Sequence, residues 1–222
     1  RTIIENVTNT YNISLLPNPF IVERKDVRGD EIIKFKEKWN IKPKNILYVG
    51  RLAKHKGLDV LIRAFNSIRM KYKGISLFIV GEDDGIYSNL DGLIKKLGLI
   101  SIIFAGKLSD YDLIKAYLSS DVLVLPSSYE SFGMVLLEAM AYGVPVIGTN
   151  VGGIPYVLQN GKCGKIIEYG DEVGLSNAII ELLNDDGIRS KYIEGGYKRI
   201  KDFSIMTISK KLEDIYQELL AN

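Results

Sequence analysis

The sequence has one cysteine, one histidine, one tryptophan and no long hydrophobic run. With Cys163 alone, an internal disulfide framework is excluded, and a single thiol is typical of a chain in a reducing compartment. No apolar run approaches the ~20 residues that a membrane-spanning helix requires, and the chain does not open on a signal-peptide pattern. We therefore predict a cytoplasmic location.

An excess of charge of one sign is also lacking. The 29 basic residues outnumber the 27 acidic residues by only two, so no strong overall field attracts nucleic acid, and we predict no nucleic-acid partner. The 222 residues are 46% hydrophobic and 25% charged, which is ordinary for a globular chain with a sizeable core.

Two common nucleotide-binding signatures are missing as well. No G-x-G-x-x-G follows the first apolar run, and no glycine-rich loop carries a Walker lysine. Both absences weigh against a nicotinamide-dependent dehydrogenase and against a P-loop nucleotide hydrolase.

What the chain does contain is a regular alternation of short apolar runs and helical patterns. The runs do not alternate polar with apolar residues, which is typical of strands covered on both faces, and helical stripes separate them. The pattern predicts a doubly wound α/β domain with a parallel sheet over residues 25–222. Residues 1–24, with prolines at positions 17 and 19, are predicted to be an entry segment or interdomain linker. The six predicted strands are Ile46 to Val49, Ser76 to Val80, Ile102 to Ala105, Val122 to Leu125, Pro145 to Gly148 and Gly164 to Ile167.

The stretch from Tyr129 to Gly143 is the most informative. It follows the fourth predicted strand and opens a helix at about Gly133. Glu138 lies on an apolar side of that helix, so its charge requires a basic partner, a hydrogen-bonding ligand or protonation. Glu130 precedes the helix in a loop whose backbone N–H groups can point at a ligand.

Other loops at the predicted carboxyl ends of strands also carry polar groups. The first, from Gly50 to Gly57, joins basic side chains to two glycines and predicts a phosphate cradle in which Arg51 and Lys56 bind oxygens. Lys54 and His55 are interpreted as ordinary loop residues of this segment.

Three further loops have weaker signals. The acidic loop from Gly81 to Gly85 lacks the ligand number of a calcium site, so turn chemistry is favoured and no metal site is predicted. The loop around Gly106 either offers backbone groups to a base or caps a helix through Ser109. Gly152 and Gly153 permit close approach of backbone to a ligand or form a plain tight turn.

Taken in order, these motifs resemble the carboxyl-terminal half of the retaining GT-B glycosyltransferases called glycosyl transferases group one. A proline-asparagine turn from Leu16 to Pro19 resembles the turn that precedes this domain in the family. Tyr156 departs from the pattern, because a glutamate commonly stands there. The residues that carry the resemblance are Val49-Gly-Arg51-Leu with Lys56-Gly57, then Glu130-Ser-Phe-Gly133, Glu138-Ala139 and Gly152-Gly-Ile-Pro155.

The resemblance implies roles for individual residues. Arg51 and Lys56 would neutralise the diphosphate of a nucleotide-sugar as it departs, and Glu130 would hold hydroxyls of the donor sugar; these three are the implied catalytic residues. Glu138 would accept hydrogen bonds from the ribose. The implied donor-binding residues are Gly50, Arg51, Lys56, Leu108, Ser131, Phe132, Gly133, Met134, Val135 and Glu138.

The implied function is transfer of a hexosyl group from a UDP, GDP or ADP sugar with retention, without a metal or another cofactor. The chain begins with Arg1 and not with methionine, so we expect a processed product or an excised piece. By the resemblance, the amino-terminal domain that binds the acceptor would be missing, and we expect the chain to be inactive alone. Peripheral membrane association would then depend on that missing domain.

Two alternatives belong to other functional classes. A nucleotide-binding or regulatory α/β module without transferase activity stays open. A two-carboxylate hydrolase is disfavoured, because Glu138 lies in an apolar helix and hydrolysis gives no reason for the cradle at Arg51 and Lys56.

Overall fold

The computed structural model describes residues 14–21 and 25–221. The described residues form two compact units: one comprises residues 25–200, and the other combines residues 14–21 with residues 201–221. The elements, in chain order, are α2 (Gly29–Lys38), β1 (Lys44–Val49), η1 (Lys54–Lys56), α3 (Leu58–Arg69), β2 (Ile75–Val80), α4 (Tyr87–Leu97), β3 (Ile102–Gly106), α5 (Asp110–Leu118), β4 (Val122–Leu125), α6 (Met134–Ala141), β5 (Val146–Thr149), α7 (Ile154–Val157), β6 (Lys165–Ile167), α8 (Glu172–Asn184), α9 (Asp186–Arg199), η2 (Ile200–Phe203) and α10 (Ile205–Ala221).

The larger unit is built on a six-stranded parallel sheet with the order β3-β2-β1-β4-β5-β6. All six predicted strands are confirmed, each within two residues of its predicted ends. The order reverses between β1 and β4, and ligands in doubly wound folds bind outside the carboxyl ends of the strands at such a point. The loops that follow β1 and β4 are therefore the first place to look for a site.

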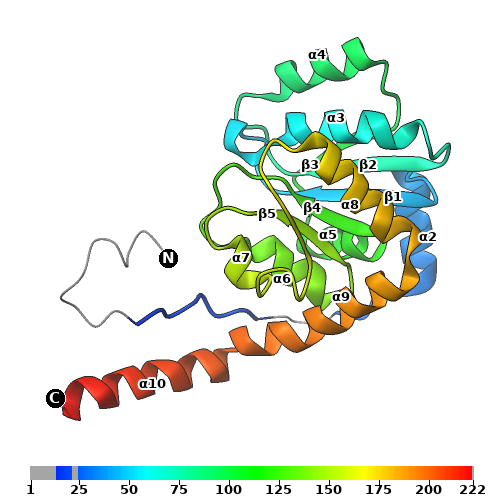
Figure 1. Cartoon of the computed structure of the whole chain (residues 1–222). Helices are drawn as coiled ribbons and strands as arrows, with labels where there is room; N and C mark the ends of the chain where they lie inside the picture. The colour runs from blue at the N-terminus through cyan, green and yellow to red at the C-terminus, as the bar shows by residue number, and fades with distance from the viewer. Residues whose placement is uncertain (1–13, 22–24, 222) are drawn as a thin grey trace. The chain divides into compact units, whose positions relative to one another are not determined.

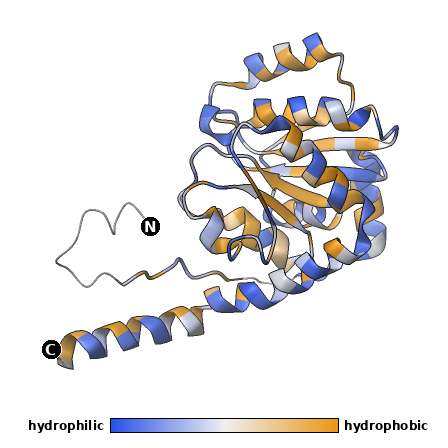
Figure 2. Cartoon of the chain, in the orientation of Figure 1, coloured by the Kyte–Doolittle hydropathy of each residue, from blue (hydrophilic) through white to orange (hydrophobic). Residues whose placement is uncertain are grey.

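Both faces of the sheet are covered, which explains why the strands are apolar throughout. On one face, Ile46, Leu77 and Val124 pack in a core cluster with buried residues of α3, α4 and α8. On the other, Phe78 of β2 packs edge-on against Phe35 of α2, with ring centroids 5.9 Å apart. Figures 1 and 2 show the apolar strands enclosed between the helical layers. The doubly wound α/β architecture is thus confirmed.

Helix α2 begins with a capping box. The N-cap position is Arg28, and Asp30 lies inside the first turn. The Glu31 carboxylate accepts a hydrogen bond from the backbone N–H of Arg28 at 3.3 Å. A side chain from the first turn of the helix thus satisfies a backbone donor at the N-cap.

The smaller unit contains the extended segment 14–21 and α10. The absence of a regular strand across Pro17 and Pro19 agrees with their missing backbone donors. Within this unit the Phe20 N–H donates to the Phe203 carbonyl at 2.7 Å. Helix α10 carries an apolar stripe that includes the exposed side chains of Leu212 and Leu219. The assignment of residues 25–222 to a single donor-binding domain stays a prediction.

Candidate functional site

The loops that follow β1 and β4 meet at the switch point of the sheet. Lys56, in η1 after β1, forms an ion pair with Glu130, in the loop after β4, with 2.7 Å between Nζ and Oε2. The two side chains are only 16% and 14% exposed. Lys56 and Glu130 are 74 positions apart in sequence, and they come together because β1 and β4 are neighbours in the sheet.

Backbone contacts fix the two loops against each other. The backbone N–H of Ser128 donates to the carbonyl of His55 at 2.8 Å, and the Ser128 hydroxyl donates to the same carbonyl at 3.2 Å. Gly57 has φ +66°, and a Cβ there would lie 2.0 Å from the Pro126 carbonyl oxygen. Glycine is therefore required at position 57 both for its backbone angle and for this close approach.

Arg51 lies at the outer side of the same loop. Its guanidinium pairs with Asp84, from the loop after β2, at 3.3 Å, and both side chains are largely exposed (66% and 52%). The hydroxyl of the buried Tyr48 donates a hydrogen bond to the Arg51 carbonyl at 2.8 Å and so fixes the backbone at Arg51. Burial, and secondarily the nearby Glu130 carboxylate, raises the pKa of Tyr48 well above its usual range. The hydroxyl thus remains a donor at neutral pH.

The start of α6 faces the end of this sheet. Gly133 is the N-cap residue with φ 89°, no side chain caps the helix, and no acidic residue lies in its first turn. The predicted helix start at Gly133 is confirmed. The first N–H groups of a helix have no intrahelical acceptor, so Met134 and Val135 present donors where an anion is stabilised. Ser131 is exposed and Phe132 is half-buried just before this turn.

Gly152 and Gly153 approach the protein's own backbone rather than open solvent. A Cβ on Gly152 would lie 1.8 Å from the Glu130 carbonyl oxygen, and one on Gly153 would lie 2.4 Å from the Ser131 carbonyl oxygen. The Gly153 N–H also donates to the Glu130 carbonyl at 3.1 Å. The sequence left open a close approach to a ligand or a plain tight turn, and in the structure both glycines lie against the loop that carries Glu130.

Glu138 finds a partner that the sequence did not indicate. Its Oε2 accepts a hydrogen bond from the Tyr117 hydroxyl of α5 at 2.6 Å. The sequence predicts a basic side chain, a ligand or protonation, whereas in the structure a neutral hydroxyl from another helix satisfies one oxygen. No sequence signal links two residues on different helices 21 positions apart, so Tyr117 was missed.

The remaining strand-end loops behave as ordinary turns. Asp83 accepts from the backbone N–H groups of Ile86 and Tyr87 at 3.0 and 2.9 Å and starts α4, which confirms turn chemistry in this acidic loop. Ser109 caps α5 by accepting from the Asp112 N–H at 3.2 Å. Leu108 is half-buried beside that cap. Among residues 14–21 and 25–221, no three His, Cys, Asp or Glu side chains gather as a metal-binding group.

Tyr156, which replaces the glutamate of the family pattern, has its own partner. The Arg199 guanidinium lies 5.0 Å from the centroid of the Tyr156 ring. The same guanidinium donates to the Tyr156 and Val157 carbonyls at 2.6 and 3.0 Å. Arg199 thus caps the carboxyl end of α7, and the tyrosine offers a ring face where a glutamate would offer charge.

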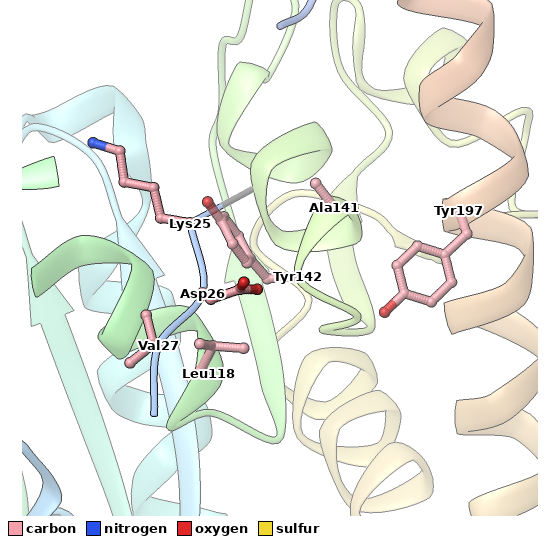
Figure 3. Close-up of a pocket in the computed structure, with 7 residues that line it drawn as sticks. All are labelled: Lys25, Asp26, Val27, Leu118, Ala141, Tyr142 and Tyr197. Atoms are coloured by element: carbon pink, nitrogen blue, oxygen red, sulfur yellow. The ribbon is translucent and has the colours of Figure 1, made fainter. Parts of the chain in front are cut away.

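One pocket lies away from all these residues (Figure 3). It has a volume of about 240 Å³ and lies at the carboxyl ends of α5 and α6, with Tyr197 reaching in from α9. It contains none of the predicted site residues. Its lining residues are Lys25, Asp26, Val27, Leu118, Ala141, Tyr142 and Tyr197.

A family model described as "Glycosyl transferases group 1" matches residues 29–199. The chain belongs to the glycosyl transferases group 1 family. The resemblance drawn from the motifs is therefore confirmed at the level of family.

Individual proteins of known name match over most of the chain. The N-acetyl-alpha-D-glucosaminyl L-malate synthase of Bacillus anthracis is 34% identical over 90% of this chain and 52% of its own length. The phosphatidyl-myo-inositol mannosyltransferase of Mycobacterium leprae is 30% identical over 78% of this chain and 46% of its own length. The chain thus spans about half the length of these relatives.

A solved structure gives the same fold. Anabaena HepE, in complex with UDP-glucose, matches with a TM-score of 0.76 and 22% identity, over 86% of this chain and 54% of that chain. The shared fold is of the GT-B type. In the part of the chain that the structure describes, none of the helices combines the length and the apolar character that crossing a membrane requires.

Proposed function

We propose that this chain is the donor-binding half of a retaining glycosyltransferase that uses a nucleotide-diphosphate sugar. The observation that carries the proposal is the Lys56–Glu130 ion pair beside the uncapped start of α6, at the switch point of the sheet. A cation and helix N–H groups suit a diphosphate, and a carboxylate suits sugar hydroxyls. One ligand carries both kinds of group.

When the donor binds in this proposal, Lys56 and Glu130 exchange each other for groups of the donor. The diphosphate takes Lys56 and the N–H groups of Met134 and Val135, and the sugar hydroxyls take the Glu130 carboxylate that Lys56 releases. The exchange gives Lys56 a new counter-charge and leaves the Glu130 carboxylate with hydrogen-bond donors, which lowers the cost of separating the pair. Arg51 moves from Asp84 to the diphosphate with little loss, since exposed ion pairs contribute little.

The same groups favour the chemical step. Negative charge grows on the departing diphosphate as the glycosidic bond breaks, and donors already in place stabilise that charge. We propose that an acceptor hydroxyl attacks from the face that the diphosphate leaves and transfers its proton to it, so that a hexosyl group is transferred with retention. No metal ion is part of the proposal.

Relatives support the class of reaction and leave its details open. The mannosyltransferase and the glucosaminyl malate synthase are both named for sugar transfer, and HepE was solved with UDP-glucose. Because the chain spans about half of each relative, we place acceptor binding in an amino-terminal domain and expect the 222-residue chain alone to transfer no sugar.

Calorimetric titration tests the proposal. The chain should bind at least one of the UDP, GDP and ADP sugars. Arg51→Ala and Glu138→Ala should each weaken that binding about tenfold or more, because each removes a charged hydrogen-bonding group. Lys54→Ala, in the same loop with an exposed side chain, is the matched control and should change binding less than twofold.

Two results would contradict the proposal. One is no binding of any of these nucleotide-sugars, and the other is binding that neither Arg51→Ala nor Glu138→Ala alters. Sugar transfer itself is tested by adding the amino-terminal half and measuring turnover, which should appear only in the mixture. Donor binding without any turnover would favour a regulatory nucleotide-binding module.

A further inference from the structure

The Glu138 carboxylate is oriented by a partly buried hydrogen bond. Its Oε2 accepts from the Tyr117 hydroxyl at 2.6 Å, a short bond of the charge-assisted kind. The α6 residues on both sides of it, Leu137 and Ala139, are fully buried. Within the described residues, Tyr117 is the side chain that fixes where this carboxylate points.

Tyr117 is itself unable to turn away. Its side chain is 1% exposed, and its ring stacks on that of Tyr142 with centroids 5.7 Å apart and planes 11° from parallel. Burial, and then the Glu138 carboxylate, raises the pKa of Tyr117 well above its usual range, so the hydroxyl keeps its proton at neutral pH. The donor that orients Glu138 is therefore present at neutral pH.

A carboxylate held by one oxygen still offers the lone pairs of the other. A ribose presents two neighbouring hydroxyls as donors, and a fixed acceptor binds them without losing further rotamer freedom. The proposed function gives Glu138 this ligand, and the inference rests on it. We propose that Tyr117 is a positioning residue that orients Glu138 toward the ribose hydroxyls and so sets the preference for ribonucleotides.

Ribose selectivity is the measurement that isolates this role. We compare, on the full 222-residue chain, the dissociation constants of a ribonucleoside diphosphate and of its 2′,3′-dideoxy form. Tyr117→Phe should weaken binding of the ribonucleotide by about tenfold, the order expected for one hydrogen bond to a charged group. Binding of the dideoxy form should be unchanged, since it lacks the hydroxyls that Glu138 accepts.

A matched control exists on the same helix. The Tyr111 hydroxyl of α5 also donates to a glutamate, Glu31, at 3.0 and 3.1 Å. Tyr111→Phe should leave both dissociation constants unchanged. In a Glu138→Gln background the effect of Tyr117→Phe should disappear, because a residue that acts through Glu138 has nothing left to orient.

The outcomes separate the two proposals. If the unmodified chain binds no nucleoside diphosphate, the proposed function fails. If it prefers the ribonucleotide and Tyr117→Phe keeps that preference, the role of Tyr117 is overturned. Equal weakening of both ligands indicates a merely structural role and overturns it too.

A second measurement covers an unstable Tyr117→Phe variant. With 3-fluorotyrosine at position 117, the ¹⁹F resonance should shift when the ribonucleoside diphosphate is added and stay in place with the dideoxy form. An identical response to both ligands would contradict the proposal.

Discussion

Lys56 and Glu130 differ from Arg51 and Asp84 in one physical respect, which is burial. The first pair is about 15% exposed on each side and the second is more than half exposed. In water the attraction between opposite charges is weak and screened, whereas partly buried charges depend on each other. Lys56 is therefore bound more strongly by Glu130 than Arg51 is by Asp84.

Double-mutant cycles measure this difference. Lys56→Met and Glu130→Gln should each lower the free energy of unfolding by about 1–3 kcal/mol, because each leaves the other charged group mostly buried without its partner. The double variant should lose less than the sum, with a coupling of about 1 kcal/mol or more in urea unfolding.

The exposed pair is the control for that cycle. Arg51→Met and Asp84→Asn should show a coupling below about 0.5 kcal/mol. Equal coupling in the two cycles would contradict the assignment of Lys56 and Glu130 as the interdependent pair.

At the scale of elements, the loop between β4 and α6 is held from two sides. From the β1 side, Ser128 bonds to the carbonyl of His55. From the β5 side, Gly152 and Gly153 lie against the backbone of Glu130 and Ser131. A segment without regular secondary structure thus gains a fixed shape, and a fixed shape is what a binding loop needs.

A methyl group added at Gly152 tests the contact between this glycine and the backbone of Glu130. Gly152→Ala should lower the free energy of unfolding by about 2–4 kcal/mol, since the new Cβ meets the Glu130 carbonyl at 1.8 Å and φ is +51°. Donor binding should fall with it, as the displaced loop carries Glu130.

Gly98→Ala separates backbone strain from steric contact. Gly98 has a similar φ of +62°, but nothing lies within 4 Å of a Cβ there. The Gly98→Ala substitution should lower the free energy of unfolding by about 1 kcal/mol and leave nucleotide binding unchanged. Equal losses at the two positions would show that the contact with Glu130 adds nothing.

At the scale of the whole molecule, two buried tyrosines give stability a dependence on alkaline pH. The pKa values of Tyr48 and Tyr117 are both raised by burial and by neighbouring carboxylates. An unfolded tyrosine releases its proton near pH 10, so above that pH the folded chain binds more protons than the unfolded chain. Stability is then fully present below about pH 10 and falls as pH rises further.

Thermal unfolding between pH 9 and pH 11 tests whether stability falls as pH rises. The melting temperature should fall across that interval, and the fall should be smaller in Tyr48→Phe and in Tyr117→Phe, which have no proton to lose. Tyr129→Phe, at an exposed ring, is the control and should keep the fall of the unmodified chain. A fall of the same size in every variant would assign the effect to other groups.

The sequence alone determined the elements and the loops that carry the site. Apolar runs and helical stripes depend on neighbours in the chain, so the six strands and the start of α6 near Gly133 could be located within two residues. The ordered motifs also gave the family. These features follow from local spacing, which a sequence displays directly.

Only the tertiary structure decided which side chains meet. Strand order puts β1 beside β4, so Lys56 reaches Glu130 across 74 positions of sequence. Helix packing brings Tyr117 to Glu138, and the turn at Gly152 reaches the backbone of Glu130. Such contacts depend on how elements stack in space, and because neither periodicity nor spacing records that stacking, the partners of the two glutamates emerged from the fold.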